Sequence, residues 1–486
     1  MYPRSGLFSF SFLLGFLIFG LSSCVTPPSS KVFHYSPLEF HSHPERFEHK
    51  FKNILTLEDC IRLGLERNLL LKASKLDSQL AESKAKQYLE EAIIPHILAQ
   101  GIYTYRNNAP GVKTGSFNIQ IGKKEKFLAS IGIEMPLFGF GKFWNKYTSI
   151  QKMGLASKED VKRQKEDLAL AITQIYFQIL LLKHQMETVK KGISILKSQL
   201  AQVESLYKQG LVTHDEVSKV KIPLLSRKQQ KRALEHLKEI TENELKNLLN
   251  IPLSFPLKLQ DIHQLPQWPL NLKSLLIALT ERYDFKAMRL RISALQEEYK
   301  SIYAKFFPTL ALKGEYFYSS DSSLLNQNWG ELTIGANWEI FRGGSRFTEL
   351  AEKEMEIQKL SLLYRNQLDK AFQQAKKFYL LCKDAQSALK VAKEQIELSK
   401  ETLKKVQEKY KQGLVTMVDV LREEGNLTQS RFSYFSSLFL LYERIYQMYH
   451  SLGTPLEKVG NLIGWISFQS PLSPTRIKRK DQKRKK

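Results

Sequence analysis

Apolar residues recur at alternating steps of four and three along two long segments of the chain. In the first segment they are Leu168, Ile172, Ile175, Ile179, Leu182, Met186, Val189, Ile193, Leu196, Leu200, Val203 and Tyr207. In the second they are Ala371, Ala375, Phe378, Cys382, Ala385, Leu389, Ala392, Ile396, Ser399, Leu403, Val406 and Tyr410. This heptad spacing is typical of helices packed in coiled coils. A continuous helix over 143–209 would be roughly 100 Å long, so we expect these helices to project. Cys382 lies in the second stripe, which predicts a small buried residue and not a reactive thiol.

Four shorter segments instead alternate apolar and polar residues with a period of two, the pattern of a β-strand. They predict strands at about 97–106, 127–137, 309–318 and 331–341, with polar loops at 107–126 and 319–330. The apolar faces comprise Ile97, Ala99, Gly101, Tyr103, Tyr105; Phe127, Ala129, Ile131, Ile133, Met135, Leu137; Leu310, Leu312, Gly314, Tyr316, Tyr318; and Leu332, Ile334, Ala336, Trp338, Ile340. The opposite faces carry Gln100, Ser130, Glu134, Lys313, Glu315, Asn337 and Glu339.

The two sets of helices and strands belong to a tandem repeat. The segments 207–213 and 410–416 share the sequence Tyr-Lys-Gln-Gly-Leu-Val-Thr, at an offset of 410 − 207 = 203 residues. Earlier in each unit the offset is 213, as from Pro95 to Pro308, so a ten-residue difference lies in the loop after Tyr105. Each unit predicts the order helix, strand, strand, helix, helix. The first unit covers 56–255, a linker follows at 256–270, and the second unit covers 271–458.

The N-terminus has the features of a secretion signal. An apolar run of about 15 residues ends at Leu21-Ser22-Ser23-Cys24, which is too short for a membrane span and suits a signal peptide over 1–23. The ending resembles a bacterial lipobox, which predicts lipidation of Cys24; an ordinary signal peptide with a chance Cys is the alternative. Residues 24–55 then predict a lipidated tether. Four histidines in it leave metal binding as an alternative to a polar linker.

Charge and motifs narrow the classes of function. The formal net charge is +24, and the segment 459–486 predicts a basic C-terminal tail. Such a run can bind nucleic acid, but export places it where little nucleic acid is present, so we expect no nucleic-acid partner. The sequence holds no P-loop, no Gly-x-Ser-x-Gly and no His-Glu-x-x-His motif. It therefore predicts no enzyme, no cofactor and no metal site.

Segments of about ten residues with one apolar face are typical of transmembrane β-strands. A half-buried sheet of a soluble protein would show the same alternation. The pairing of these strands with a secretion signal favours the membrane.

Taken together, the repeat resembles the TolC family of outer-membrane efflux channels over about residues 56–456. The resemblance rests on Ile94-Pro95 and Phe307-Pro308 before the strands, on 136–142 and 338–344 after them, and on the two Gly-Leu-Val-Thr turns. It implies an α+β membrane protein: long coiled-coil helices forming a periplasmic α-barrel, and four transmembrane strands per chain in a 12-stranded barrel. It also implies a homotrimer in outer-membrane lipid, and a periplasmic adaptor and an inner-membrane pump as partners.

The two turns are the strongest candidates for a site. Gly210 and Gly413 suit the left-handed conformation that ends a helix. Thr213 with Glu216, and Thr416 with Asp419, have the spacing of a capping box. The resemblance implies that such turns dock an adaptor, and their residues are Gly210, Leu211, Val212, Thr213, Gly413, Leu414, Val415 and Thr416. We expect the four apolar ones to be exposed.

The resemblance further implies a constriction at this end of the tunnel. The candidates for this aperture are Asp419, Glu423, Arg422 and Glu216. In a trimer Asp419 would form a ring of negative charge that favours cations; a purely structural role at the helix N-terminus is the alternative. Arg422 stands where some family members have a second acidic residue.

Three hypotheses remain from the sequence. The first is a passive export duct of a tripartite efflux or type I secretion system, driven by another protein. The second is a non-conducting periplasmic coiled-coil tether or structural envelope protein, which explains the heptads but not the four amphipathic strands. The third is the nucleic-acid-binding protein that the charge suggests.

Overall fold

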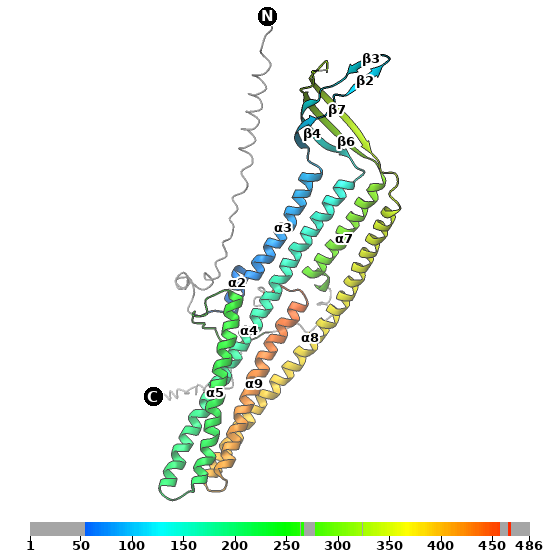
Figure 1. The fold of residues 1–486 in the computed structure, drawn as a ribbon. Coiled ribbons are helices and arrows are strands. Elements are labelled where there is room, and N and C mark those ends of the chain that lie inside the picture. The colour runs from blue at the N-terminus through cyan, green and yellow to red at the C-terminus, as the bar shows by residue number, and fades with distance from the viewer. Residues whose placement is uncertain (1–53, 263, 267–277, 323, 457–464, 468–486) are drawn as a thin grey trace, which may run out of the picture. The chain divides into compact units, whose positions relative to one another are not determined.

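Two repeats of long helices and short strands make up the fold in a computed structural model of the chain (Figure 1). The structure describes residues 54–262, 264–266, 278–322, 324–456 and 465–467. The predicted signal peptide, Cys24, all of the tether before Ile54 and most of the basic tail lie outside the described residues.

The helices confirm the heptad prediction. In the first repeat they are α2 (Leu57–Arg67), α3 (Leu69–Ala92), α4 (Lys142–Lys208) and α5 (His214–Leu249). In the second repeat they are α7 (Tyr283–Tyr303), α8 (Ser345–Lys411) and α9 (Met417–Ser451), with short 3-10 turns η2 (Ala278–Glu281) and η3 (Ala304–Phe306). Helices α4 and α8 each have 67 residues, which makes each about 100 Å long.

The helix interiors use the predicted stripes. Ile172, Ile179 and Leu196 of α4 are buried, and Phe177 stacks on Tyr442 of α9 at 5.2 Å between ring centroids. Cys382 is fully buried in α8, as expected, and burial raises the pKa of its thiol to about 12.

Strands of both repeats form one sheet in the order β1-β4-β6-β7. Its members are β1 (His96–Tyr105), β4 (Glu125–Phe138), β6 (Thr309–Ser319) and β7 (Asn328–Asn337), all antiparallel to their neighbours. Strand β7 begins and ends earlier than the sequence pattern indicates. The loop expected at 107–126 contains a hairpin of β2 (Gly111–Thr114) and β3 (Phe117–Gln120), which the pattern did not predict.

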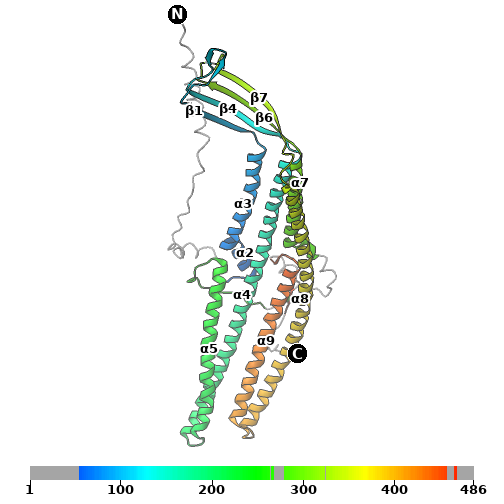
Figure 2. The ribbon, with the colours of Figure 1, turned by 45° about the vertical axis from the view of Figure 1, so that its right-hand side comes forward.

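The sheet and the two turns lie at opposite ends of the long helices. Helices α3 and α7 lead into strands, and α4 and α8 leave from them, whereas the α4–α5 and α8–α9 turns lie at the far end (Figures 1 and 2). The strands and the turns are therefore separated by the full length of α4 and α8.

Segments outside the repeats attach midway along the helices. Leu55 is buried and forms a parallel bridge with Leu259, in the segment predicted as the linker. Tyr176 of α4 donates a hydrogen bond of 2.6 Å to the carbonyl of Gln260, and His184 Nε2 lies 3.0 Å from Asp261 Oδ2. A second short pair joins β5 (Gln264–Pro266) to β8 (Trp465–Ser467). The linker is thus fastened to α4 by side-chain contacts.

Candidate functional site

The register of the sheet places the apolar positions of all four strands on one face. Across β1 and β4, Tyr103 pairs with Phe127 and Ile97 with Ile133. Ile133 in turn pairs with Gly314, which pairs with Leu332 of β7. Because cross-strand partners point to the same side of a sheet, the predicted alternation gives a continuous apolar face.

The opposite face carries polar side chains. Glu134 pairs with Lys313, which pairs with Thr333, and the Nζ of Lys313 lies 2.7 Å from the carboxylate of Glu315. Glu339, which the sequence placed on this face, lies beyond the end of β7. The polar face of β7 therefore ends at Asn337.

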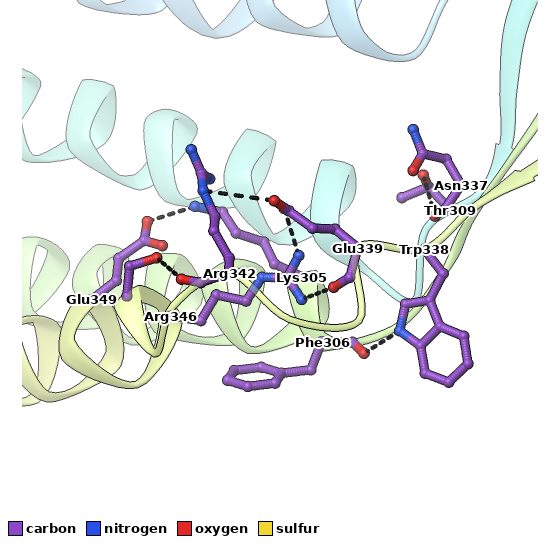
Figure 3. A network of polar contacts seen from close by, with 10 residues as sticks. Lys305, Phe306, Thr309, Asn337, Trp338, Glu339, Arg342, Arg346 and Glu349 are labelled. Carbon is purple, nitrogen blue, oxygen red and sulfur yellow. Dashed lines mark hydrogen bonds and ion pairs between the residues drawn. The ribbon is translucent and has the colours of Figure 1, made fainter.

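Glu339 instead joins the sheet to α8, as Figure 3 shows. Arg346 donates hydrogen bonds to the backbone carbonyl of Glu339 at 2.5 Å and to its carboxylate at 2.7 Å. The indole of Trp338, the residue just after β7, donates to the carbonyl of Phe306 at 3.0 Å. Lys305 pairs with Glu349 at 2.5 Å. These contacts fix the angle at which the sheet meets the helices.

Aromatic residues mark both ends of the apolar face. At the helical end Phe140 packs on Phe138 and Phe307, with ring centroids 4.7 and 4.9 Å apart. At the other end Tyr103 and Tyr105 are about two-thirds exposed. Aromatic girdles that flank an apolar band are typical of transmembrane β-barrels.

At the far end of the helices, the two turns have the same geometry. Gly210 and Gly413 have φ of +70° and +72°. The N–H of Leu211 donates to the carbonyl of Leu206, five residues back, and Leu414 donates likewise to Lys409, each at 3.0 Å. These bonds are those of the Schellman motif, which ends a helix with a left-handed residue.

The apolar residues of the turns divide into two kinds. Leu211 and Leu414 are 67% and 70% exposed, as the sequence predicted. Val212 and Val415 are only half-buried and not fully exposed, and Val212 packs on a buried cluster. This cluster comprises Val203, Val217, Val220, Met417 and Val420. Because its residues come from α4, α5 and α9, the cluster holds the two turns side by side. One leucine of each turn, Leu211 or Leu414, stays exposed and available for contact with another protein.

The two predicted capping boxes differ. Thr416 caps α9 in a capping box: its hydroxyl oxygen accepts from the N–H of Asp419 at 3.4 Å, and its own N–H donates to the carboxylate of Asp419 at 3.0 Å. Thr213 occupies the N-cap position of α5 but makes no side-chain cap. The hydrogen bonds from Thr416 hold the pKa of Asp419 below its ordinary value, and the charge of Arg422 adds to this effect.

The other aperture candidates lie in the first two turns of α9 and α5. Arg422 is exposed and pairs with Asp419 at 3.4 Å, and Glu423 accepts a hydrogen bond from Asn426 at 3.1 Å. Glu216, on α5, pairs with Lys219 at 2.9 Å. Asp419 is thus already engaged by a hydroxyl, an N–H and a guanidinium within its own chain.

Sequence reasoning missed a buried charged layer just above the turns. Glu424 is only 8% exposed although it carries a carboxylate. The charged groups that interact with it are Arg431 of α9 and Arg227 of α5. The signal was available: Val420, Glu424, Leu427, Arg431 and Tyr434 follow the heptad spacing. Charged residues at seam positions are unusual and costly.

This layer is incompletely paired. Oε1 of Glu424 and Nε of Arg431 are buried without a hydrogen-bond partner within the described ranges. Burial raises the pKa of Glu424, although the charges of Arg431 and Arg227 act in the opposite direction. Burial likewise lowers the pKa of both arginines. The layer is therefore a weak point in the seam between the returning helices.

The described residues set limits on other kinds of site. No helix there combines enough length and apolar character to cross a membrane. No group of three or more His, Cys, Asp or Glu side chains there could hold a metal ion.

Comparison with known families decides the class of protein. The family described as outer membrane efflux protein matches residues 60–250 and 275–435, which is most of both repeats. The chain belongs to this family. The sequence-based assignment to the outer-membrane efflux channels is thereby confirmed.

Individual relatives of this outer membrane efflux protein are distant. The pyoverdine export outer membrane protein OpmQ of Pseudomonas putida is 23% identical over 299 residues, and the match covers 60% of this chain and 63% of OpmQ. The chain thus matches less than two-thirds of that relative's length.

Solved structures show the same fold at low identity. CusC, whose structure concerns folding and transmembrane channel formation, has a TM-score of 0.72 at 19% identity, over 82% of this chain and 92% of CusC. The CmeC outer membrane channel of Campylobacter jejuni also has a TM-score of 0.72, at 16% identity, over 82% of this chain and 86% of CmeC. The predicted combination of long helices and four strands is therefore confirmed as a known fold.

Proposed function

We propose that this protein is the outer-membrane channel of a tripartite efflux or type I secretion system. The observation that carries the proposal is a four-stranded sheet with one apolar face whose outer strands, β1 and β7, have no further partner among the described residues. In lipid every backbone N–H and C=O must be hydrogen-bonded, so such edges must pair with another chain. The four strands of one chain therefore cannot form a complete membrane-spanning structure by themselves.

Closure between copies of the chain favours a homotrimer. Two copies would supply eight strands, and side chains fill a barrel of that size. Three copies supply twelve, which leaves room for a conduit. The same three copies bring together the long helices of both repeats, which would continue the conduit into the periplasm.

The chain would conduct its cargo passively. Its sequence contains no P-loop, no Gly-x-Ser-x-Gly and no His-Glu-x-x-His motif, so energy would come from an inner-membrane pump. A periplasmic adaptor would bridge the two by docking on Leu211 and Leu414, the exposed apolar residues of the turns. OpmQ bears the name of a pyoverdine exporter, but 23% identity supports the class of channel and not its cargo.

A lipid anchor and a periplasmic aperture complete the proposal. Acylation of Cys24 would fasten the chain to outer-membrane lipid through the tether at 24–55. The aperture would lie at the turns, where Asp419, Arg422, Glu423 and Glu216 gather near the N-termini of α9 and α5.

Single-channel conductance of the purified full-length protein in planar bilayers tests the proposal. A stable trimer that inserts and conducts supports it, whether the conductance is small or rises only when adaptor is added. A protein that stays soluble after delipidation and never inserts would contradict it and would favour the periplasmic tether.

A further inference from the structure

The two repeats differ at the end of the sheet that lies away from the helices. The offset between them changes from 213 to 203, so the first repeat has ten extra residues after Tyr105. These form the β2–β3 hairpin, which projects beyond the sheet (Figure 1). The proposed function does not use this insertion.

The insertion and its flanks are strongly basic. Residues 106–126 carry five cations and a single acid, Glu125; the cations are Arg106, Lys113, Lys123, Lys124 and Lys126. The second loop, 319–330, holds Asp321 and neither Lys nor Arg. None of the five cations forms an ion pair within the part of the chain that the structure describes. Of the two loops at this end of the sheet, only 106–126 therefore carries a positive charge, and no ion pair within the described residues neutralises its cations.

Three of these lysines border a shallow hollow at the edge of the apolar face. Lys123, Lys124 and Lys126 line it together with Tyr103 and Phe127, and Glu125 is also part of its wall. Tyr103 and Phe127 are a cross-strand pair on the apolar face, whereas Lys126 pairs with Thr104 and points to the polar face. Lys123 and Lys124 precede β4 and are exposed. The hollow therefore combines ammonium groups with aromatic rings at the level where an apolar band ends.

The base of the hollow is fixed by backbone contacts to the other loop. Phe127 N–H donates to the hydroxyl of Ser320 at 2.8 Å, and Ser320 N–H donates to the carbonyl of Phe127 at 2.9 Å. Arg106 N–H donates to the carbonyl of Lys124 at 2.7 Å. The backbone at Lys124 and Phe127 is therefore anchored without a ligand.

We propose that this hollow binds the phosphate-bearing headgroup of an anionic lipid in the outer leaflet of the outer membrane. The inference rests on the proposed function, because it requires the apolar face to contact lipid. Lys123 and Lys124 would bind phosphate, and Tyr103 and Phe127 would lie along the start of the acyl chains, as aromatic residues do at membrane interfaces. In a trimer there would be three such sites.

Native mass spectrometry of the full-length trimer, titrated with bis-phosphorylated lipid A, tests this. We expect Lys123→Ser/Lys124→Ser to lower the affinity roughly thirtyfold, since each Lys near an anionic surface contributes about a fivefold gain. The matched control is Lys376→Ser/Lys377→Ser, which removes two adjacent exposed lysines from α8. It should bind lipid A as the wild type does.

The outcomes separate the two proposals. Equal binding of lipid A by the wild type and Lys123→Ser/Lys124→Ser, or equal binding of phosphatidylcholine and lipid A by the wild type, would overturn the lipid site. A change in ion selectivity of the double variant with unchanged lipid binding would place the lysines at the conduit and overturn it as well. Failure to form a membrane-inserted trimer would instead overturn the proposed function.

Discussion

Arg346 donates to two acceptors of one residue, the backbone carbonyl and the carboxylate of Glu339. The guanidinium is buried, and its plane lies over the ring of Phe306 at 5.8 Å from the centroid. This pair joins the end of β7 to the start of α8. It therefore connects the part that we propose to be in lipid to the part that we propose to be in the periplasm.

Replacing Arg346 should weaken this junction. We expect Arg346→Met to lower the free energy of unfolding by about 2 kcal/mol, because hydrogen bonds to charged groups contribute roughly 1.5–3 kcal/mol. Glu339→Gln should cost less, since the bond to the backbone carbonyl remains. Thermal unfolding of the detergent-solubilised protein measures both. Equal losses in the two variants would show that only the carboxylate bond matters.

The Glu424 layer should make stability depend on pH. The pKa of Glu424 is raised in the folded chain. Its contribution to the free energy of unfolding is therefore most favourable below the ordinary glutamate pKa of 4.5, and it declines as pH rises through the pKa of the folded chain. We expect Glu424→Gln to melt like the wild type at pH 4 and at a higher temperature at pH 8. Glu423→Gln, at the neighbouring half-exposed position, is the control. A lower melting temperature of Glu424→Gln at pH 8 would mean that attraction to Arg227 and Arg431 outweighs burial.

The fastening of the linker to α4 should have the opposite pH dependence. Burial by itself raises the pKa of Asp261, but the hydrogen bond and charge of His184, with the charge of Lys183, outweigh it and hold the pKa at about 2. The stability from this carboxylate is present above the ordinary aspartate value of 3.8 and is lost as pH falls through 2. Asp261→Asn should therefore cost about 2 kcal/mol at pH 7 and little near pH 2.

Asp215→Asn is the control for Asp261→Asn, because Asp215 is 70% exposed and pairs with Lys219 only at the surface. Denaturant titrations at several pH values compare the two. A pH-independent loss in Asp261→Asn would show that the amide disrupts packing and that the ion pair is not the cause.

The cap of α9 offers a way to separate two roles of Asp419. If its carboxylate acts mainly as a cap, Thr416→Ala and Asp419→Ala should loosen the turn alike, and both should raise single-channel conductance. The contacts to Thr416 and Arg422 favour this result. Loss of divalent-cation block in Asp419→Ala alone would instead establish the charged ring. Conductance with and without added divalent cations on the periplasmic side measures the difference.

Substitutions at Leu211 and Val212 should distinguish an effect on adaptor docking from an effect on folding. Leu211→Ser removes an exposed side chain and should lower adaptor binding at least tenfold with little effect on melting. Val212→Ser alters a side chain packed on the buried cluster, so it should lower the melting temperature. Co-purification with the adaptor and thermal unfolding give the two readouts. Unchanged adaptor binding by Leu211→Ser combined with Leu414→Ser would contradict docking at the turns.

The sequence by itself determined the secondary structure and the repeat. Heptads and two-residue alternation are local patterns set by the geometry of helix and strand, so α4, α8 and the apolar faces of β1 and β4 could be predicted within a few residues. The glycines Gly210 and Gly413 marked the turns for the same reason, because a left-handed residue favours glycine.

Only the tertiary structure decided how these elements meet. The pairing of β4 with β6 joins residues of different repeats, and no local pattern encodes it. Strand β7 ends at Asn337, which pairs with Thr309 at the start of β6, although the alternation continues to Ile340. Val212 is half-buried and Leu211 exposed because the cluster formed with α9 lies on one side of the turn. Burial of Glu424 likewise depends on helices far apart in sequence, because the environment of a side chain is set by neighbours in space.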